Sequence, residues 1–221
     1  MGSLALEKEI IGSLDYISLG LKDPIKDYIG KPRVLSLVST FLERSIQTCE
    51  RNLETSLAKD DDVSSSIFYG LRAPSLTIQQ YIDRIFKYSC CSPSCFIIAH
   101  IYVDRFIQRT NLRLTSLNVH RLLITSVMVA AKFMDDAFFD NAFYARVGGV
   151  STTELNKLEI KFLFGVDFRL HVNVQTFRKY CSLLKKQAND GIIERPLIHS
   201  YSIEESCTKN DDSVLSSFRF R

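Results

Sequence analysis

The sequence predicts an all-α protein in which a bundle of helices surrounds one central helix. The run 117–135 is apolar or small on nearly every side, and a helix without a polar stripe is buried on all sides. Several other segments repeat apolar residues in steps of three and four, which is the spacing of an amphipathic helix. No segment of useful length shows the apolar–polar alternation of a half-buried strand.

The central run has one alternative interpretation, a membrane-spanning helix. Such a span needs about 20 predominantly apolar residues, whereas Thr125, Ser126 and Lys132 interrupt a shorter run here. The sequence therefore favours a core helix, and we expect no membrane partner. Lys132 lies in the last turn, so the most buried element ends in a charge.

Three helices are predicted before the central run. In the first, residues 33–57, one face is apolar: Val34, Leu37, Val38, Phe41, Leu42 and Ile46. The second starts near Thr77, which fits a capping box with Gln80. The third starts after Ser92 as N-cap, with Pro93 in the first turn, where its missing N–H costs nothing. It runs to about Arg109.

Three helices are also predicted after the central run. A short one over 141–147 precedes Gly148 and Gly149, since glycine is the usual residue after a helix end. Ser151 and Glu154 fit a second capping box. In the helix that follows, we expect a buried face of Leu155, Leu158 and Phe162, widened by Ile160, Leu163 and Phe164. Asn173 is expected to cap a last helix over 174–187.

The charges and cysteines narrow the class of protein. With 28 basic and 25 acidic residues the formal net charge is +3, which is too balanced to predict a nucleic-acid partner. The first residues lack the pattern of a signal peptide. We therefore expect an intracellular protein, nuclear or cytoplasmic, whose six cysteines are buried free thiols rather than disulfides.

No residue set in the sequence indicates catalysis or a cofactor. There is no glycine-rich phosphate loop, no G-x-S-x-G motif and no H-E-x-x-H motif. The clustered Cys90, Cys91 and Cys95 lack nearby residues that would complete a tetrahedral metal set. The aspartates at 135, 136 and 140 are better explained as a charged helix end and loop than as a cation site. We expect neither an enzyme nor a bound metal.

Two charges remain on otherwise apolar helices, Lys132 and Glu159. In one interpretation both reach solvent, Lys132 also being favoured at a helix C-terminus by the helix dipole. In the other, they meet beside exposed apolar side chains and bind a partner. Spacing alone favours the first interpretation.

Three stretches resemble the cyclin box: Tyr102–Phe106, Val129–Phe133 and Leu158–Leu163. Their order and separation match a five-helix box over about 76–170, and the single box looks most like plant U-type (P-type) cyclins, which are similar to fungal phosphate-regulatory cyclins. The resemblance implies a cyclin domain over 32–187, an N-terminal extension over 1–31 and a C-terminal tail over 188–221.

The resemblance also implies a role. Cyclins bind and activate a cyclin-dependent protein kinase, as regulatory subunits in cell-cycle or nutrient (phosphate) signalling. The family's kinase-contacting lysine and glutamate fall on Lys132 and Glu159, with Asp104 expected to hold the lysine in place. The family's apolar kinase contacts fall on Phe133, Leu163, Phe168 and Leu170.

One departure from cell-cycle cyclins concerns substrate docking. Their Met-Arg-Ala-Ile-Leu stretch corresponds here to about Pro74–Ile78, without the arginine, and the tryptophan of that groove falls near Tyr81. Docking through the groove is therefore not expected. A cyclin-box adaptor in a transcription complex is the alternative function, although the balanced charge and the single box oppose it.

Overall fold

The computed structural model describes residues 16–21, 31–55, 67–136 and 138–190, and within these ranges the regular structure is helical throughout. The helices are α2 (Arg33–Thr55), α3 (Ile78–Ser89), α4 (Pro93–Thr110), α5 (Val119–Met134), α6 (Asn141–Gly148), α7 (Thr152–Gly165) and α8 (Val174–Asp190). The predicted all-α class is confirmed. The predicted boundaries differ by a few residues, with α2 ending at Thr55 and α8 continuing to Asp190. Most of the predicted N-terminal extension and the tail lie outside the described residues.

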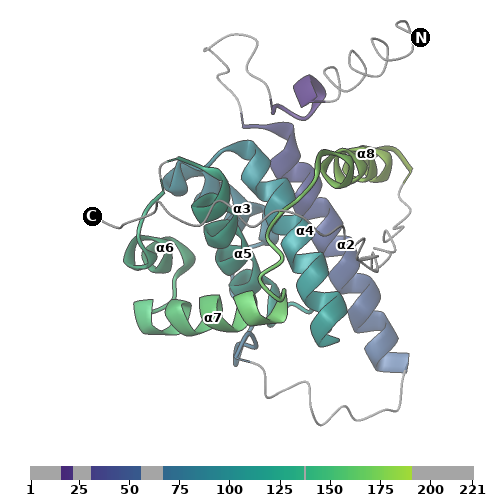
Figure 1. Ribbon diagram of the computed structural model, residues 1–221. Coiled ribbons are helices and arrows are strands. Elements are labelled where there is room, and N and C mark those ends of the chain that lie inside the picture. The colour runs from purple at the N-terminus through teal and green to yellow at the C-terminus, as the bar shows by residue number, and fades with distance from the viewer. Residues whose placement is uncertain (1–15, 22–30, 56–66, 137, 191–221) are drawn as a thin grey trace, which may run out of the picture.

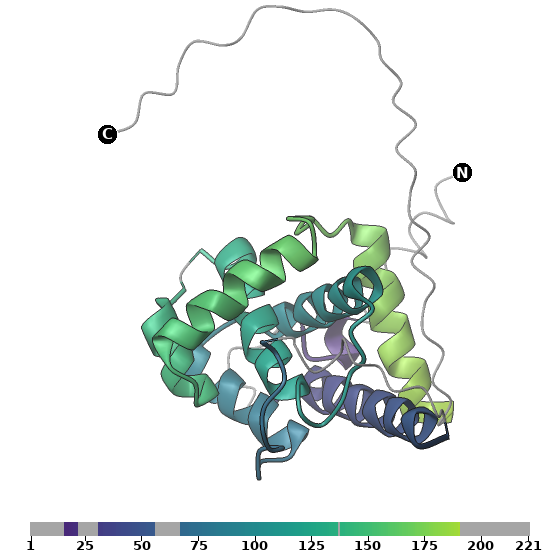
Figure 2. The same ribbon diagram turned by 90° about the horizontal axis from the view of Figure 1, so that it is seen from below.

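Helix α5 forms the centre of the bundle, as its sequence predicts. It contacts α3, α4, α6 and α7, and its side chains from Val119 to Ala131 are buried except for the partly exposed Arg121. Figure 1 shows α7 along the lower edge and α8 at the upper right. In Figure 2, α6 and α7 lie on one side of the bundle and α2 and α8 on the other. In the part of the chain that the structure describes, no helix is long and apolar enough to span a membrane.

The predicted capping residues are placed correctly, but only one box is complete. Thr77 accepts from the Gln80 backbone, and the Gln80 side chain accepts from the Thr77 backbone. Ser151 accepts from the Glu154 backbone at 3.1 Å, but the Glu154 carboxylate accepts instead from Arg121 Nε on α5, at 2.7 Å. The second box is therefore half formed, because an ionic partner on the neighbouring helix is available to the glutamate.

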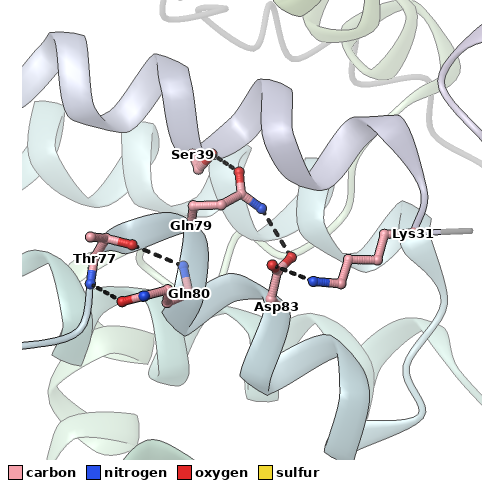
Figure 3. Close-up of polar contacts among 6 residues, drawn as sticks. All are labelled: Lys31, Ser39, Thr77, Gln79, Gln80 and Asp83. Atoms are coloured by element: carbon pink, nitrogen blue, oxygen red, sulfur yellow. Dashed lines mark hydrogen bonds and ion pairs between the residues drawn. The ribbon is translucent and has the colours of Figure 1, made fainter.

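Helix α2, which precedes the five-helix box, is joined to α3 by a chain of polar contacts that Figure 3 shows. Ser39 of α2 donates to the Gln79 side chain, and Gln79 donates to Asp83 at 2.9 Å. The ammonium of Lys31, just before α2, reaches the other oxygen of Asp83 at 2.7 Å. The side chain of Asp83 is only 21% exposed. These polar contacts fix how α2 is positioned along α3 on the solvent-facing side of the two helices. Apolar packing fixes it on the side that faces the core.

Helix α8 packs on α2 and α4 at the other end of the box. Asn173 caps it as predicted, since its side-chain oxygen accepts from the Thr176 backbone at 2.7 Å. Tyr180, Cys181 and Leu184 are buried, also as predicted. The cyclin-like box is thus enclosed by an additional helix before it and another after it.

The cysteines among the described residues are free thiols. Cys91, Cys95 and Cys181 are buried, Cys49 is partly buried and Cys90 is exposed. The expectation of burial is therefore wrong for Cys90. It occupies the C-cap of α3 in the left-handed conformation, with φ of 50°, where the turn to α4 directs its side chain away from the core.

A glycine allows α7 to approach α4. A Cβ at Gly165 would overlap the ring of Phe106, which is buried and stacked on Phe162 at a centroid distance of 5.0 Å. We therefore expect Gly165→Ala to destabilise the fold by about 1–3 kcal/mol through overpacking, although alanine is the better helix former. Urea unfolding followed by circular dichroism measures this free energy.

The matched test is the pair of Gly165→Ala with Phe106→Leu, which removes the ring that the new methyl group would strike. The double variant should lose less stability than the sum of the two single losses, because the residues are in direct contact. Additive losses would show that the cost of Gly165→Ala does not come from contact with the Phe106 ring.

Candidate functional site

Lys132 and Glu159 meet at the junction of α5 and α7. Lys132 occupies the last turn of α5, and its ammonium lies 2.6 Å from Glu159 Oε1. The two side chains are 27% and 17% exposed, so the pair is largely withdrawn from solvent. The interpretation in which each charge extends separately to water is wrong. The pair forms because the apolar sequence of α5 ends at Lys132, and this end of α5 lies beside α7, which carries Glu159.

A third side chain, Asn141, closes the pair into a ring of hydrogen bonds. Lys132 donates to Asn141 Oδ1 at 2.5 Å, and Asn141 Nδ2 donates to Glu159 Oε2 at 2.7 Å. The same Nδ2 donates to Asn156 Oδ1 at 2.7 Å. Asn141 is the first residue of α6, and Asp140 before it caps the helix by accepting from the Phe143 backbone at 2.8 Å. We call Lys132, Glu159 and Asn141 the polar triad.

The polar triad leaves a definite set of hydrogen-bonding groups unused. An ammonium has three donors, and each carboxylate oxygen has two lone pairs. Within the triad Lys132 donates twice, and each oxygen of Glu159 accepts once. Lys132 therefore keeps one N–H donor that the triad does not use, and each carboxylate oxygen of Glu159 keeps one unused lone pair. Such a set is suited to backbone N–H and C=O groups of a partner, and a charged group fixed in position binds them better than a mobile one.

Exposed apolar side chains lie on the helices that carry Lys132 and Glu159 and in the turn that follows α7. Phe133 and Met134 extend α5, and Ile160 and Phe164 lie on α7; Phe164 is 68% exposed. Phe168, in the turn after α7, is also exposed and packs edge-to-face on Phe164 at a centroid distance of 5.3 Å. We call these five residues the apolar rim. Soluble proteins rarely expose such groups together unless the surface binds something.

The predicted apolar kinase contacts differ in exposure. Phe133 and Phe168 are exposed as a contact surface requires, whereas Leu163 and Leu170 are partly buried against the core. Conversely, Ile160 and Phe164 were expected to widen the buried face, which is wrong. Each follows a buried residue by two positions, Leu158 and Phe162, and two positions turn about 200° around a helix.

Helix α4 holds the turn that carries Phe168. Asp167 and Phe168 both have left-handed backbones, with φ of 57° and 53°, a conformation that non-glycine residues rarely adopt. Arg109 pairs with Asp167 at 3.2 Å. Arg105 donates to the carbonyls of Arg169 and His171. Contacts from α4 therefore hold the residues before and after Phe168, and this fixes the position of Phe168 in the apolar rim.

Asp104 has a different partner from the one that the resemblance implies. Its carboxylate accepts from the Tyr180 hydroxyl of α8 at 3.0 Å, and the contacts of Lys132 are with Glu159 and Asn141 instead. Asp104 thus ties α8 to α4, and the supporting contact to the lysine comes from Asn141. The sequence offers only a weak sign of Asn141: an amide directly after an N-cap aspartate.

The residue near the tryptophan position of the docking groove, Tyr81, makes internal contacts, whereas Pro74, Leu76, Thr77 and Ile78 line an open cavity. Tyr81 is buried, donates to the Gly148 carbonyl at 2.9 Å and packs edge-to-face on His120. Burial raises the pKa of the Tyr81 phenol and lowers the pKa of the His120 imidazole. Both side chains are therefore neutral parts of the core at physiological pH.

Comparison with known proteins gives consistent results. A family model described as Cyclin matches residues 33–170, from the start of α2 to the end of the turn that carries Phe168. The chain is similar to Cyclin-P3-1 of Oryza sativa subsp. japonica, with 48% identity over 95% of this chain and 89% of that protein. It is also similar to Cyclin-U3-1 of Arabidopsis thaliana (48%, covering 96% and 93%) and to Cyclin-U4-1 of the same plant (51%, covering 70% and 76%).

The polar triad predicts a measurable coupling between its members. Asn141→Ala should lower the free energy of unfolding by about 1 kcal/mol, the net value of a typical hydrogen bond. In a Lys132→Met background the same change should cost less, because the donor to Asn141 is already missing. Chemical denaturation of the four proteins of this cycle measures the coupling.

The matched control is Asn156→Ala. Asn156 accepts a hydrogen bond from Asn141 and takes no part in the contacts between Lys132, Glu159 and Asn141. Its loss should therefore cost less than about 0.5 kcal/mol, as for an ordinary surface change. Equal costs for Asn141→Ala in both backgrounds would contradict the triad as a coupled unit.

Proposed function

This chain belongs to the cyclin family, and we propose on that premise that it is a regulatory subunit that binds and activates a cyclin-dependent protein kinase. The observation that carries the proposal is the polar triad within the apolar rim. It supplies a donor and acceptors held by hydrogen bonds, on helices that also carry uncovered apolar side chains, as a protein-binding site requires. The family consists of kinase regulators rather than enzymes, in agreement with a surface built for binding.

The kinase segment that fits this surface is an element that offers both backbone polar groups and apolar side chains. In cyclins the contacted element is the regulatory C helix of the kinase and its neighbourhood. The unused donor of Lys132 and acceptors of Glu159 would bind backbone groups there, while the apolar rim packs on side chains. Contacts of the polar triad alone would recognise a backbone, whereas the rim adds preference for particular side chains.

The proposed mechanism is a shift between two kinase conformations. A protein kinase is active when a lysine on its third strand pairs with a glutamate on its C helix. A cyclin that binds the inward orientation of that helix more tightly than the outward one raises the population of the active state. The rigidity of the site serves this purpose, because a mobile surface would bind both orientations.

The resemblance to U-type and P-type cyclins also suggests where such a kinase acts. We propose a role in cell-cycle control or in nutrient signalling, with phosphate as the candidate nutrient, in the nucleus or the cytoplasm. A pull-down from the source tissue, read by mass spectrometry, identifies the kinase, and the partner so found serves in the experiments below.

Removing either charge of the pair should abolish most kinase binding. Lys132→Ala and Glu159→Ala each truncate a desolvated charged contact, which costs about 2–5 kcal/mol, or some 30- to several-thousand-fold in affinity. The double variant should lose less than the sum, because both groups hold one kinase segment. Calorimetry with the identified kinase measures affinity, and a phosphorylation assay measures activation.

The matched control is Lys87→Ala, which removes an exposed lysine from the last turn of another helix, α3. Its affinity for the kinase should equal that of the wild type. Circular dichroism confirms that each variant is folded. Wild-type affinity in folded Lys132→Ala and Glu159→Ala proteins would remove this surface from the proposed interface.

The apolar rim yields a separate prediction for Phe164. Phe164→Ala should weaken kinase binding by at least about 1 kcal/mol, roughly fivefold, as expected for an aromatic residue that contributes to an interface. Its effect on stability should be small because the ring is mostly exposed. Leu71→Ala is the control, since Leu71 is fully exposed outside the rim. Equal affinities for the two variants would exclude Phe164 from the interface.

A further inference from the structure

One short sequence pattern occurs three times in the chain. An arginine is followed by a serine three positions later and then by a leucine, in the segments Arg33–Ser36, Arg72–Ser75 and Arg113–Ser116. Arginine-directed serine/threonine kinases recognise such a pattern, because a carboxylate of the enzyme binds the guanidinium through charge-assisted hydrogen bonds. The three copies share the arginine, the serine and the leucine, so the fold decides which of them an enzyme can reach.

The fold makes two of the three copies unavailable. Ser36 lies in the first turn of α2, where its hydroxyl donates to the Arg33 carbonyl at 2.8 Å. Ser116 directly follows two buried residues, and its backbone N–H donates to the Glu50 carboxylate of α2 at 2.9 Å. A kinase binds the residues around its target serine in an extended conformation, so either site would have to unfold locally before it could react.

The third copy lies on an exposed segment without regular structure. Every residue from Leu71 to Thr77 is exposed, and the segment belongs to no helix. Among the described residues, the Arg72 guanidinium and the Ser75 hydroxyl have no hydrogen-bond or ionic partner. Pro74 directly precedes the serine, and proline favours an extended conformation in the residue before it. The arginine, the serine and the backbone between them are therefore accessible to an enzyme.

The exposed segment is held at both of its ends. Before it, Phe68 is buried in the core, and the Gly70 backbone N–H donates to the Leu117 carbonyl at 2.8 Å. At its other end, His120 Nε2 of α5 donates to the Leu76 carbonyl at 2.9 Å. The stretch between these anchors can therefore bind in the cleft of an enzyme without disturbing the packing of the helices.

We propose that Ser75 is a phosphorylation site for an arginine-directed serine/threonine kinase, with Arg72 as the residue that the enzyme recognises. The Ser75 hydroxyl oxygen attacks the γ-phosphorus of ATP, the bond from that phosphorus to the β–γ bridging oxygen breaks, and ADP leaves. The hydroxyl proton passes to the catalytic base of the enzyme. The phosphate adds a charge of about −1.5 to −2 at pH 7 to a segment, 71–77, in which Arg72 is the only charged residue. Phosphorylation therefore reverses the local charge.

The proposed site is separated from the polar triad by the length of α5. His120, which anchors the segment, lies in the first turn of this helix, whereas Lys132 lies in the last turn. At a rise of about 1.5 Å per residue, their backbones are about 18 Å apart along the helix. The chain is therefore expected to carry the phosphate and bind its partner kinase at the same time. This consequence rests on the proposed function; the phosphorylation of Ser75 does not.

The first experiment compares the three copies of the pattern within one protein. The purified full chain is incubated with ATP and a calcium/calmodulin-dependent protein kinase, which serves as the arginine-directed probe, and is then digested with trypsin. Cleavage after each arginine places the three serines in separate peptides, 34–44, 73–84 and 114–121, for mass spectrometry. We expect Ser75 to be phosphorylated at least about tenfold faster than Ser36 or Ser116, which require local unfolding. Synthetic peptides that contain each complete pattern have no fold, so all three should be substrates.

Variants of the full chain test the recognition. Arg72→Ala should slow the phosphorylation of Ser75 at least about tenfold, because a hydrogen-bonded contact to a charged group is lost. The matched control, Lys87→Ala, removes an exposed charge from the last turn of α3 and should keep the wild-type rate. Circular dichroism confirms that both variants are folded. An unchanged rate in Arg72→Ala, or phosphorylation of Ser36 or Ser116 in the folded chain as fast as that of Ser75, would overturn the proposal.

The second experiment tests the independence of the two sites. The chain phosphorylated on Ser75 should bind the kinase identified by the pull-down with an affinity within about twofold of the unmodified chain, as expected for distant sites without shared partners. A much larger loss of affinity would overturn the independence of the two sites. Absence of kinase binding by the unmodified chain would instead refute the proposed function and leave the phosphorylation of Ser75 standing.

Discussion

The constraint on which the rest of the structure depends is the burial of α5 from all sides. A helix of this kind contributes apolar surface to every neighbour, and α3, α4, α6 and α7 take their positions from it. It must nevertheless end, and its terminal carbonyls favour a cation there. Lys132 supplies that cation at a point still enclosed by α6 and α7, where an unpaired ammonium would be costly. Glu159 and Asn141 satisfy it, so the site follows from the requirements of the core.

A second consequence is that the surface around Lys132 is rigid without being closed. The turn after α7 has two consecutive left-handed residues, and Arg105 and Arg109 hold it from α4. The same region requires Gly165, because α7 approaches the Phe106 ring too closely for a Cβ. Helices that are fixed by the core therefore present exposed aromatic rings in defined positions. In the proposed complex this arrangement reduces the ordering that binding requires.

The sequence predicted those features that act within one helical turn. Periodicity identified the helices, and the predicted caps Thr77, Ser151 and Asn173 each accept from the backbone three residues on. Ser92 occupies its predicted N-cap position without a side-chain hydrogen bond. The sequence failed where the answer depends on which helix packs alongside. Glu154 bonds Arg121 on α5 in place of its own cap, Asp104 bonds Tyr180 on α8, and Phe164 faces outward because no helix covers that side of α7 among the described residues. Asn141 was missed for the same reason, since its three partners lie on α5 and α7.

The division of the site into polar and apolar parts bears on specificity in the proposed complex. Backbone N–H and C=O groups are common to every kinase, so the donor of Lys132 and the acceptors of Glu159 do not by themselves distinguish one kinase from another. Distinction would have to come from side-chain contacts, for which the exposed Phe133, Met134, Ile160, Phe164 and Phe168 are available. Of these, the α5 pair lies nearest Asp135, whereas the α7 group is held by α4 through the turn at 167–171. A change at the end of α5 would therefore alter affinity through one part of the rim, while the part fixed by α4 keeps its shape and its selectivity.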